Sequence, residues 1–109
     1  MSNFKTIIDL FGLTPEEAAS YLKAEPSDII RWCETADSPP LDVWRQLVKL
    51  FDTIHFAAEE AAKAADLDRM DATDLNRIAM TLPEQDGALE GPRRAITAMA
   101  VTSLARVFV

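Results

Sequence analysis

The chain has 109 residues, which is enough for one hydrophobic core and too few to predict two independent domains. Hydrophobic residues make up 49% of it and only three residues are glycine, a composition that excludes a disordered or turn-rich chain. Eighteen acidic residues against eleven basic ones give a formal net charge of −7, the wrong sign for attraction to phosphate groups.

The sequence lacks the features of a membrane span, a signal peptide and a metal site. No apolar run is long enough for a membrane span, and the segment 1–9 lacks the pattern of a signal peptide, so we expect a cytoplasmic protein without a membrane partner. The single cysteine, Cys33, cannot form a disulfide within the chain, and the single histidine, His55, has no partner at a metal-ligand spacing. We therefore expect neither a metal nor a cofactor, and interpret Cys33 as a small buried filler.

Two helices are predicted before residue 25. The first has an apolar face and ends at Gly12. Its apolar residues are Phe4, Ile7, Ile8 and Phe11. The second begins at Thr14, where an N-cap threonine, Pro15 at the first helical position and Glu17 form a capping box.

A third helix and a much longer fourth one come next. Pro26 precedes the third, which carries Ile29, Ile30 and Trp32. The tandem prolines Pro39 and Pro40 then break the chain before the longest predicted helix. An apolar stripe with steps of three and four runs along that helix: Leu41, Trp44, Val48, Phe51, His55, Ala58, Ala62 and Ala65, widened by Leu47 and Ile54. The stripe fits one helix, or two helices that bend near Thr53; we expect both tryptophans in the core.

The last third predicts two further helices separated by a loop. Asp71 and Asp74 resemble an acidic N-cap before a short helix, and Pro92 suits the first turn of a final one. The short helix would carry Leu75, Ile78, Ala79 and Leu82, and the final one Ile96, Met99, Ala100, Leu104 and Val107. Between them, 83–92 is predicted to be a loop. The apolar end, 105–109, is expected to be buried in the core or against a partner.

The segment 14–35, TPEEAASYLKAEPSDIIRWCET, resembles the helix-turn-helix of the lambda-repressor-like (XRE) family. Ala19 takes the place of the small residue in the family's first motif helix, and Leu22 that of its apolar anchor. Ile29 and Trp32 take the apolar positions of the second motif helix. Two helices that cross over a short turn need a small residue at the crossing and aliphatic anchors beside it.

The segment also departs from the family pattern. Lys23 stands where the turn usually has glycine, and lysine must adopt the required backbone angles at a cost. Pro15 replaces a common glutamine, Glu25 replaces a frequent serine, and Cys33 replaces a frequent glutamate.

Together the periodicity and the resemblance predict an all-α fold, a single compact domain of five to six helices. It divides into a helix-turn-helix core, 1–56, and a helical extension, 57–109, which is a candidate dimerisation region. The resemblance implies a transcriptional regulator that binds double-stranded DNA, and we expect it to act as a homodimer joined through the stripe of the long helix. The implied DNA-facing residues are Ser27, Ile30, Arg31 and Glu34, with Arg45 and Lys49 on the next helix reaching the DNA backbone.

The charge of the motif leaves an alternative function open. Between Thr14 and Thr35, five acidic and two basic residues give a local charge of −3. An acidic protein-interaction module, such as an adaptor, antitoxin-like partner or inhibitor, would keep the helix-turn-helix scaffold without DNA binding. A monomer in which the C-terminal helices cover the stripe is the alternative to the homodimer. No set of side chains supplies a nucleophile, a base and an oxyanion stabiliser together, so we do not expect an enzyme.

Overall fold

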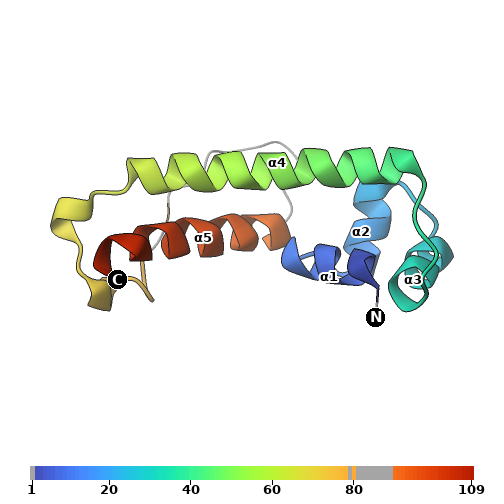
Figure 1. Cartoon of the computed structure of the whole chain (residues 1–109), viewed down its shortest axis with the longest axis horizontal. Coiled ribbons are helices and arrows are strands. Elements are labelled where there is room, and N and C mark those ends of the chain that lie inside the picture. The colour runs from blue at the N-terminus through green and yellow to red at the C-terminus, as the bar shows by residue number, and fades with distance from the viewer. Residues whose placement is uncertain (1, 79, 81–89) are drawn as a thin grey trace. The chain divides into compact units, whose positions relative to one another are not determined.

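The computed structural model describes residues 2–78, 80 and 90–109, and every regular element in these residues is helical (Figure 1). The predicted all-α class is therefore confirmed. The elements are α1 (Asn3–Leu10), α2 (Pro15–Leu22), α3 (Pro26–Glu34), α4 (Leu41–Ala64), the 3₁₀ turns η1 (Leu67–Arg69) and η2 (Ala72–Asp74), α5 (Glu90–Ala105) and the 3₁₀ turn η3 (Arg106–Phe108). None of the helices in these residues is long and apolar enough to cross a membrane.

The chain forms two compact units, Met1–Phe51 and Asp52–Val109, and α4 contributes to both. The expected division after residue 56 and the boundary between the units thus both fall inside this one helix. α4 is a single element of 24 residues, so the alternative of two helices that bend near Thr53 is wrong.

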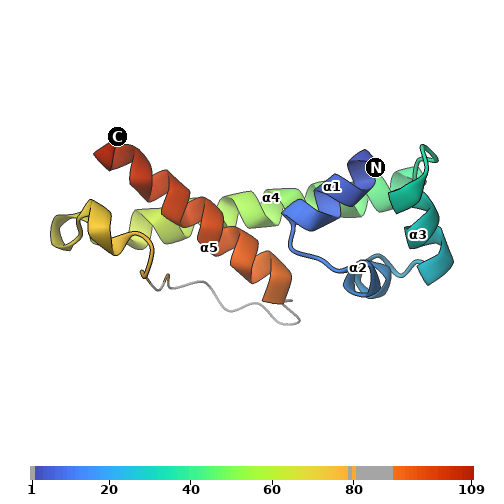
Figure 2. The same cartoon turned by 90° about the horizontal axis from the view of Figure 1, so that it is seen from below.

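The first unit is built around α3, which packs against both α1 and α2. Figure 2 looks along the axis of α2, while α1 lies in the plane of the view. The core of this unit consists of Phe4, Ile8, Phe11, Leu13, Ala18, Ala19, Leu22, Ile29, Trp32, Cys33, Val43, Leu47 and Leu50. Gly12, with φ of 75°, allows the chain to turn after α1, as its place in the sequence predicted.

The stripe predicted along α4 does not coincide with the buried face. Buried residues of α4 are Val43, Leu47, Leu50, Ile54, Ala57, Ala58 and Ala61. Of the predicted stripe, Leu41, Val48, Phe51 and His55 are exposed instead. The helix carries apolar residues on two faces, and its packing partners cover the face of Leu47 and Ile54, which the prediction had treated as a widening of the stripe. Trp32 is buried as expected, whereas Trp44 is only half-buried.

In the second unit, small residues lie on the buried faces of α4 and α5. Ala57, Ala58 and Ala61 are buried on α4, and so are Ile96, Ala100 and Leu104 on α5. A groove is lined by His55 and Glu59 of α4, Met99 of α5 and Arg106 of the 3₁₀ turn η3.

Three predictions for the last third of the chain need correction. Asp71 does act as an N-cap, but the element it starts is the 3₁₀ turn Ala72–Asp74 and not an α-helix. Of the residues assigned to that helix, Ala79 and Leu82 lie outside the described residues, as do positions 83–89 of the predicted loop. Glu90 is already helical, so α5 begins before Pro92, which still lies in its first turn. The end of the chain is exposed, with Val107 at 62%, and is not buried in this chain's core.

Candidate nucleic-acid interface

The start of α2 is fixed by a reciprocal pair of hydrogen bonds. The backbone N–H of Glu17 donates to Thr14 Oγ1 at 3.1 Å, and the backbone N–H of Thr14 donates to Glu17 Oε1 at 3.0 Å. This is the capping box that the sequence predicted, with Pro15 at the first helical position. Two backbone donors that a helix start leaves without intrahelical partners are therefore satisfied, which sets where α2 begins.

The turn between α2 and α3 depends on a left-handed residue. Lys23 has φ of 54° and ψ of 42° and ends α2 in the left-handed helical region. The N–H of Ala24 then donates to the carbonyl of Ala19 at 3.0 Å, so the chain changes direction within Lys23–Glu25. For a residue with a Cβ this conformation costs about 1 kcal/mol, which explains why glycine is usual at such a turn. Lys23 thus adopts the left-handed backbone angles that the turn requires, as expected.

α4 also holds the end of α2. The side-chain amide of Gln46 donates to the backbone carbonyl of Leu22 at 3.5 Å. That carbonyl belongs to the last turn of α2, where helix geometry leaves carbonyl groups without intrahelical donors. Two features therefore fix the position of the turn: the backbone conformation of Lys23 and the hydrogen bond that Gln46 of α4 donates to Leu22.

α3 has one buried side and one exposed side. Ile29, Trp32 and Cys33 are buried, and Ile29 is 0% exposed. On the other side, the four DNA-facing residues implied by the resemblance are all exposed: Ser27, Ile30, Arg31 and Glu34. Their spacing of three, four and seven residues places them on one side of the helix. The structure thus brings these four predicted site residues together on one face.

Arg31, the positively charged residue of this face, forms ion pairs with two aspartates. Arg31 Nη2 lies 3.2 Å from Asp28 Oδ1, and Arg31 Nε lies 3.7 Å from Asp37 Oδ2. The side chain of Arg31 remains 52% exposed, so water screens both pairs. Asp37, from the loop after α3, was not among the predicted site residues. No spacing rule points to it, because the loop and not a helix turn brings it to Arg31.

The remaining two predicted residues lie on α4, not on α3. Arg45 and Lys49 are exposed and one turn apart. Arg45 Nη1 donates to Asp42 Oδ1 at 3.0 Å, and the side chain of Arg45 is 74% exposed. Like Arg31, Arg45 therefore carries its charge in a solvated pair with an aspartate of its own helix.

Cys33 fills the buried side of α3, as expected. It is 8% exposed, and burial raises the pKa of its thiol. A thiol with a raised pKa is mostly protonated near neutral pH and is a poor nucleophile. The prediction of a small buried filler is confirmed.

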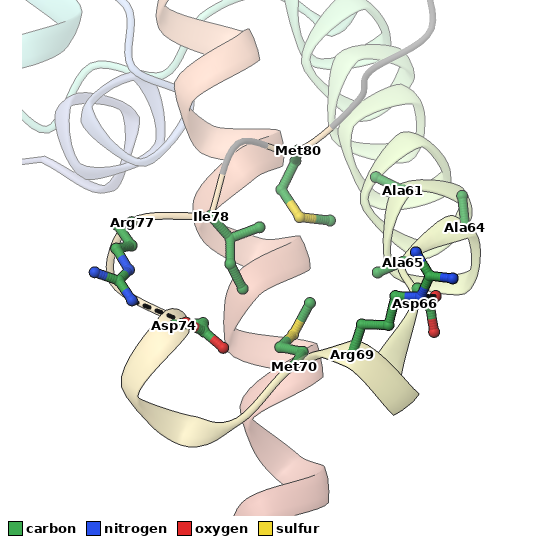
Figure 3. Close-up of a pocket in the computed structure, with 10 residues that line it drawn as sticks. All are labelled: Ala61, Ala64, Ala65, Asp66, Arg69, Met70, Asp74, Arg77, Ile78 and Met80. Atoms are coloured by element: carbon green, nitrogen blue, oxygen red, sulfur yellow. Dashed lines mark hydrogen bonds and ion pairs between the residues drawn. The ribbon is translucent and has the colours of Figure 1, made fainter.

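The second unit contains a pocket that sequence reasoning did not find (Figure 3). It has a volume of about 530 Å³ and lies at the end of α4, beside the two 3₁₀ turns. The side chains of Met70, Ile78 and Met80 point into it, and Asp74 is paired with Arg77 at 3.1 Å beside it. The N–H of Asp71 and the guanidinium of Arg77 lower the pKa of the Asp74 carboxyl. The carboxylate and the guanidinium are therefore engaged with one another at the surface.

Comparison with known proteins identifies no relative of this chain. The chain matches no protein-family model, and neither a curated protein nor a solved structure shows a significant similarity to it.

Proposed function

We propose that this protein is a cytoplasmic transcriptional regulator of the XRE type, which binds double-stranded DNA by placing the exposed face of α3 in the major groove. The observation that carries the proposal is the left-handed turn at Lys23 between the capped helix α2 and α3. A short turn of this kind sets a second helix across the first, and DNA-binding proteins present the second helix to base edges.

The side chains of the exposed face have suitable chemistry. Arg31 carries the donors that recognise the O6 and N7 atoms of guanine, and Ile30, 50% exposed, offers an apolar contact for a thymine methyl group. Ser27, in the first turn of α3, can donate to a phosphate. Glu34 completes the face and can accept a hydrogen bond from cytosine N4.

The acidic partners of Arg31 do not prevent this contact. Both ion pairs are exposed, and pairs of this kind contribute about 0–1 kcal/mol each. A bidentate contact to guanine contributes about 1–3 kcal/mol of discrimination. Release of both solvated pairs therefore costs an amount of the same order as, or smaller than, the discrimination that one guanine contact supplies.

The protein acts as a homodimer in this proposal, because two copies of a helix-turn-helix bind neighbouring half-sites more tightly than one. The exposed apolar side chains of α4 in the first unit support it. Leu41 is 60%, Val48 56% and Phe51 45% exposed, at steps of seven and three residues on one side of the helix. A second copy would bury this row.

The test is selection of sequences from a randomised duplex pool by the purified protein, at about 50 and 200 mM salt. We expect a consensus to emerge, and Arg31→Ala to lose it. Arg69→Ala is the matched control, because Arg69 also forms an exposed pair with the aspartate three residues before it, at 3.3 Å, in the second unit. Absence of any retained duplex at the lower salt concentration would contradict the proposal.

A second candidate function is an acidic protein-interaction module, and one observation favours it. Ile30 is half exposed on a face where Glu34 is also exposed and Arg31 is paired with two aspartates. An apolar side chain on an acidic face suits a basic protein partner. Ile30→Asp would abolish capture of such a partner, while retention of duplex DNA by the wild-type protein would contradict this function.

A further inference from the structure

Arg31 lies between two carboxylates that reach it from different directions. Asp28, on α3, lies three residues earlier, so the helix itself brings its carboxylate 3.2 Å from Nη2. Asp37 lies beyond the end of α3, and its carboxylate is 3.7 Å from Nε. Two negative charges thus lie within 4 Å of one positive charge, and the cluster as a whole is acidic.

The loop that carries Asp37 is held by hydrogen bonds. Thr35 Oγ1 donates to the carbonyl of Arg31 at 2.7 Å and accepts from the backbone N–H of Asp37 at 3.1 Å. Further along, Trp44 Nε1 donates to Ser38 Oγ at 3.1 Å. The backbone N–H of Asp37 is therefore held by Thr35, and the side chain of the next residue, Ser38, is held by Trp44, so the loop as well as the ion pair keeps the Asp37 carboxylate near Arg31.

We infer that Asp28 and Asp37 determine the sequence specificity of α3, by keeping Arg31 from DNA phosphates and leaving it available to a guanine edge. This inference rests on the proposed function. A phosphate carries a full negative charge and is repelled by both carboxylates as it approaches Arg31. The O6 and N7 atoms of guanine are neutral acceptors, so the same carboxylates oppose that contact much less.

The inference has a signature in the salt dependence of binding. A side chain that contacts a phosphate makes log K fall more steeply with log salt concentration, by about one for each phosphate neutralised. With both aspartates in place, Arg31 adds little to that slope. When both aspartates are removed, Arg31 can bind phosphates on any duplex. The affinity for DNA of random sequence then increases more than the affinity for the selected duplex.

The experiment compares the wild-type protein with Asp28→Asn/Asp37→Asn, on the selected duplex and on a duplex of random sequence, across a range of salt concentrations. The variant is expected to bind random DNA roughly three- to tenfold more tightly. Its affinity for the selected duplex should rise less, and its salt slope on random DNA should steepen by about one.

Asp66→Asn/Asp74→Asn is the matched control. It changes the net charge by the same amount, and it too removes the aspartate partners of two exposed arginines, Arg69 at 3.3 Å and Arg77 at 3.1 Å. The control should leave the ratio of the two affinities unchanged. An equal gain on both duplexes, or the same change of ratio in the control, would overturn the inference while the proposed function stands. If no form of the protein binds either duplex, both fail.

Discussion

The rings of Phe4 and Trp32 meet edge to face in the first unit, with centroids 5.7 Å apart and planes inclined by 77°. This contact joins α1 to α3, and Trp32 belongs to the buried side of the helix whose other side carries the proposed interface. Ser2 strengthens the same junction, because its hydroxyl donates to the carbonyl of Trp32 and accepts from the N–H of Lys5. The exposed face of α3 therefore depends on α1 for its orientation.

We expect the two rings to contribute more together than their separate burial. Aromatic pairs in this geometry add about 0.5–1.5 kcal/mol beyond the area that they bury. A double-mutant cycle with Phe4→Leu and Trp32→Leu, assayed by urea unfolding, measures this coupling. The pair Ile8→Val and Leu104→Ala, which takes one residue from each unit, is the control. Additive losses for Phe4 and Trp32 would show that the edge-to-face contact contributes nothing of its own.

Lys23→Gly should stabilise the protein. Glycine adopts φ of 54° without the clash that a Cβ causes, and the gain, about 1 kcal/mol at most, is reduced by the greater freedom of glycine in the unfolded chain. Lys23→Ala removes the same charge and keeps the Cβ, so it should leave the free energy of unfolding nearly unchanged. If alanine stabilised as much as glycine, then charge and not backbone strain would be the cause.

The raised pKa of Cys33 predicts a loss of stability in alkaline solution. In the unfolded chain the thiol ionises near its ordinary pKa of 9.0, whereas burial keeps it protonated to higher pH in the folded protein. Between those two pKa values the folded state binds more protons, so the free energy of unfolding falls as pH rises. Cys33→Ala should lose this dependence. Equal slopes above pH 9.0 in both proteins would contradict the prediction.

Val48→Asp should prevent the proposed homodimer from forming. A charge placed in the middle of the exposed row on α4 would be buried without a partner in the dimer, at a cost of several kcal/mol. Sedimentation over a range of protein concentrations is the measurement. Leu10→Asp on α1 is the matched control, because Leu10 is also well exposed, at 64%, and lies in the same unit outside the row. A wild-type protein that stays monomeric throughout would contradict the prediction.

The sequence was most informative where a local rule decides the structure. The cap at Thr14 and the tandem prolines before Leu41 involve only neighbouring residues, and the helices α2 and α4 begin where these signals stand. Asp71 shows the limit of such a local rule, because its cap was predicted correctly but the type of helix was not. An aspartate cap also starts a 3₁₀ turn, and whether an α-helix continues from that turn depends on contacts that the local sequence does not contain.

Long-range contacts account for the remaining errors. α4 has apolar residues on two faces, and only the tertiary packing decides that Leu47 is buried while Val48 is exposed. In the candidate site, the resemblance to a helix-turn-helix implied that Ile30 and Arg31 lie on one exposed face, and both are exposed on α3. The approach of Asp37 to Arg31 is different, because it depends on the hydrogen bonds that Thr35 forms in the loop.

The distribution of aromatic side chains provides two optical reporters for one unit. Trp32 and Trp44 are the only tryptophans of the chain, and both belong to the unit Met1–Phe51, as does the single tyrosine, Tyr21. Intrinsic fluorescence therefore reports the melting of this unit alone, while circular dichroism reports the helices of both. If the two signals change at different temperatures, the units unfold in separate steps, and coincident curves would mean that α4 couples them into one cooperative transition.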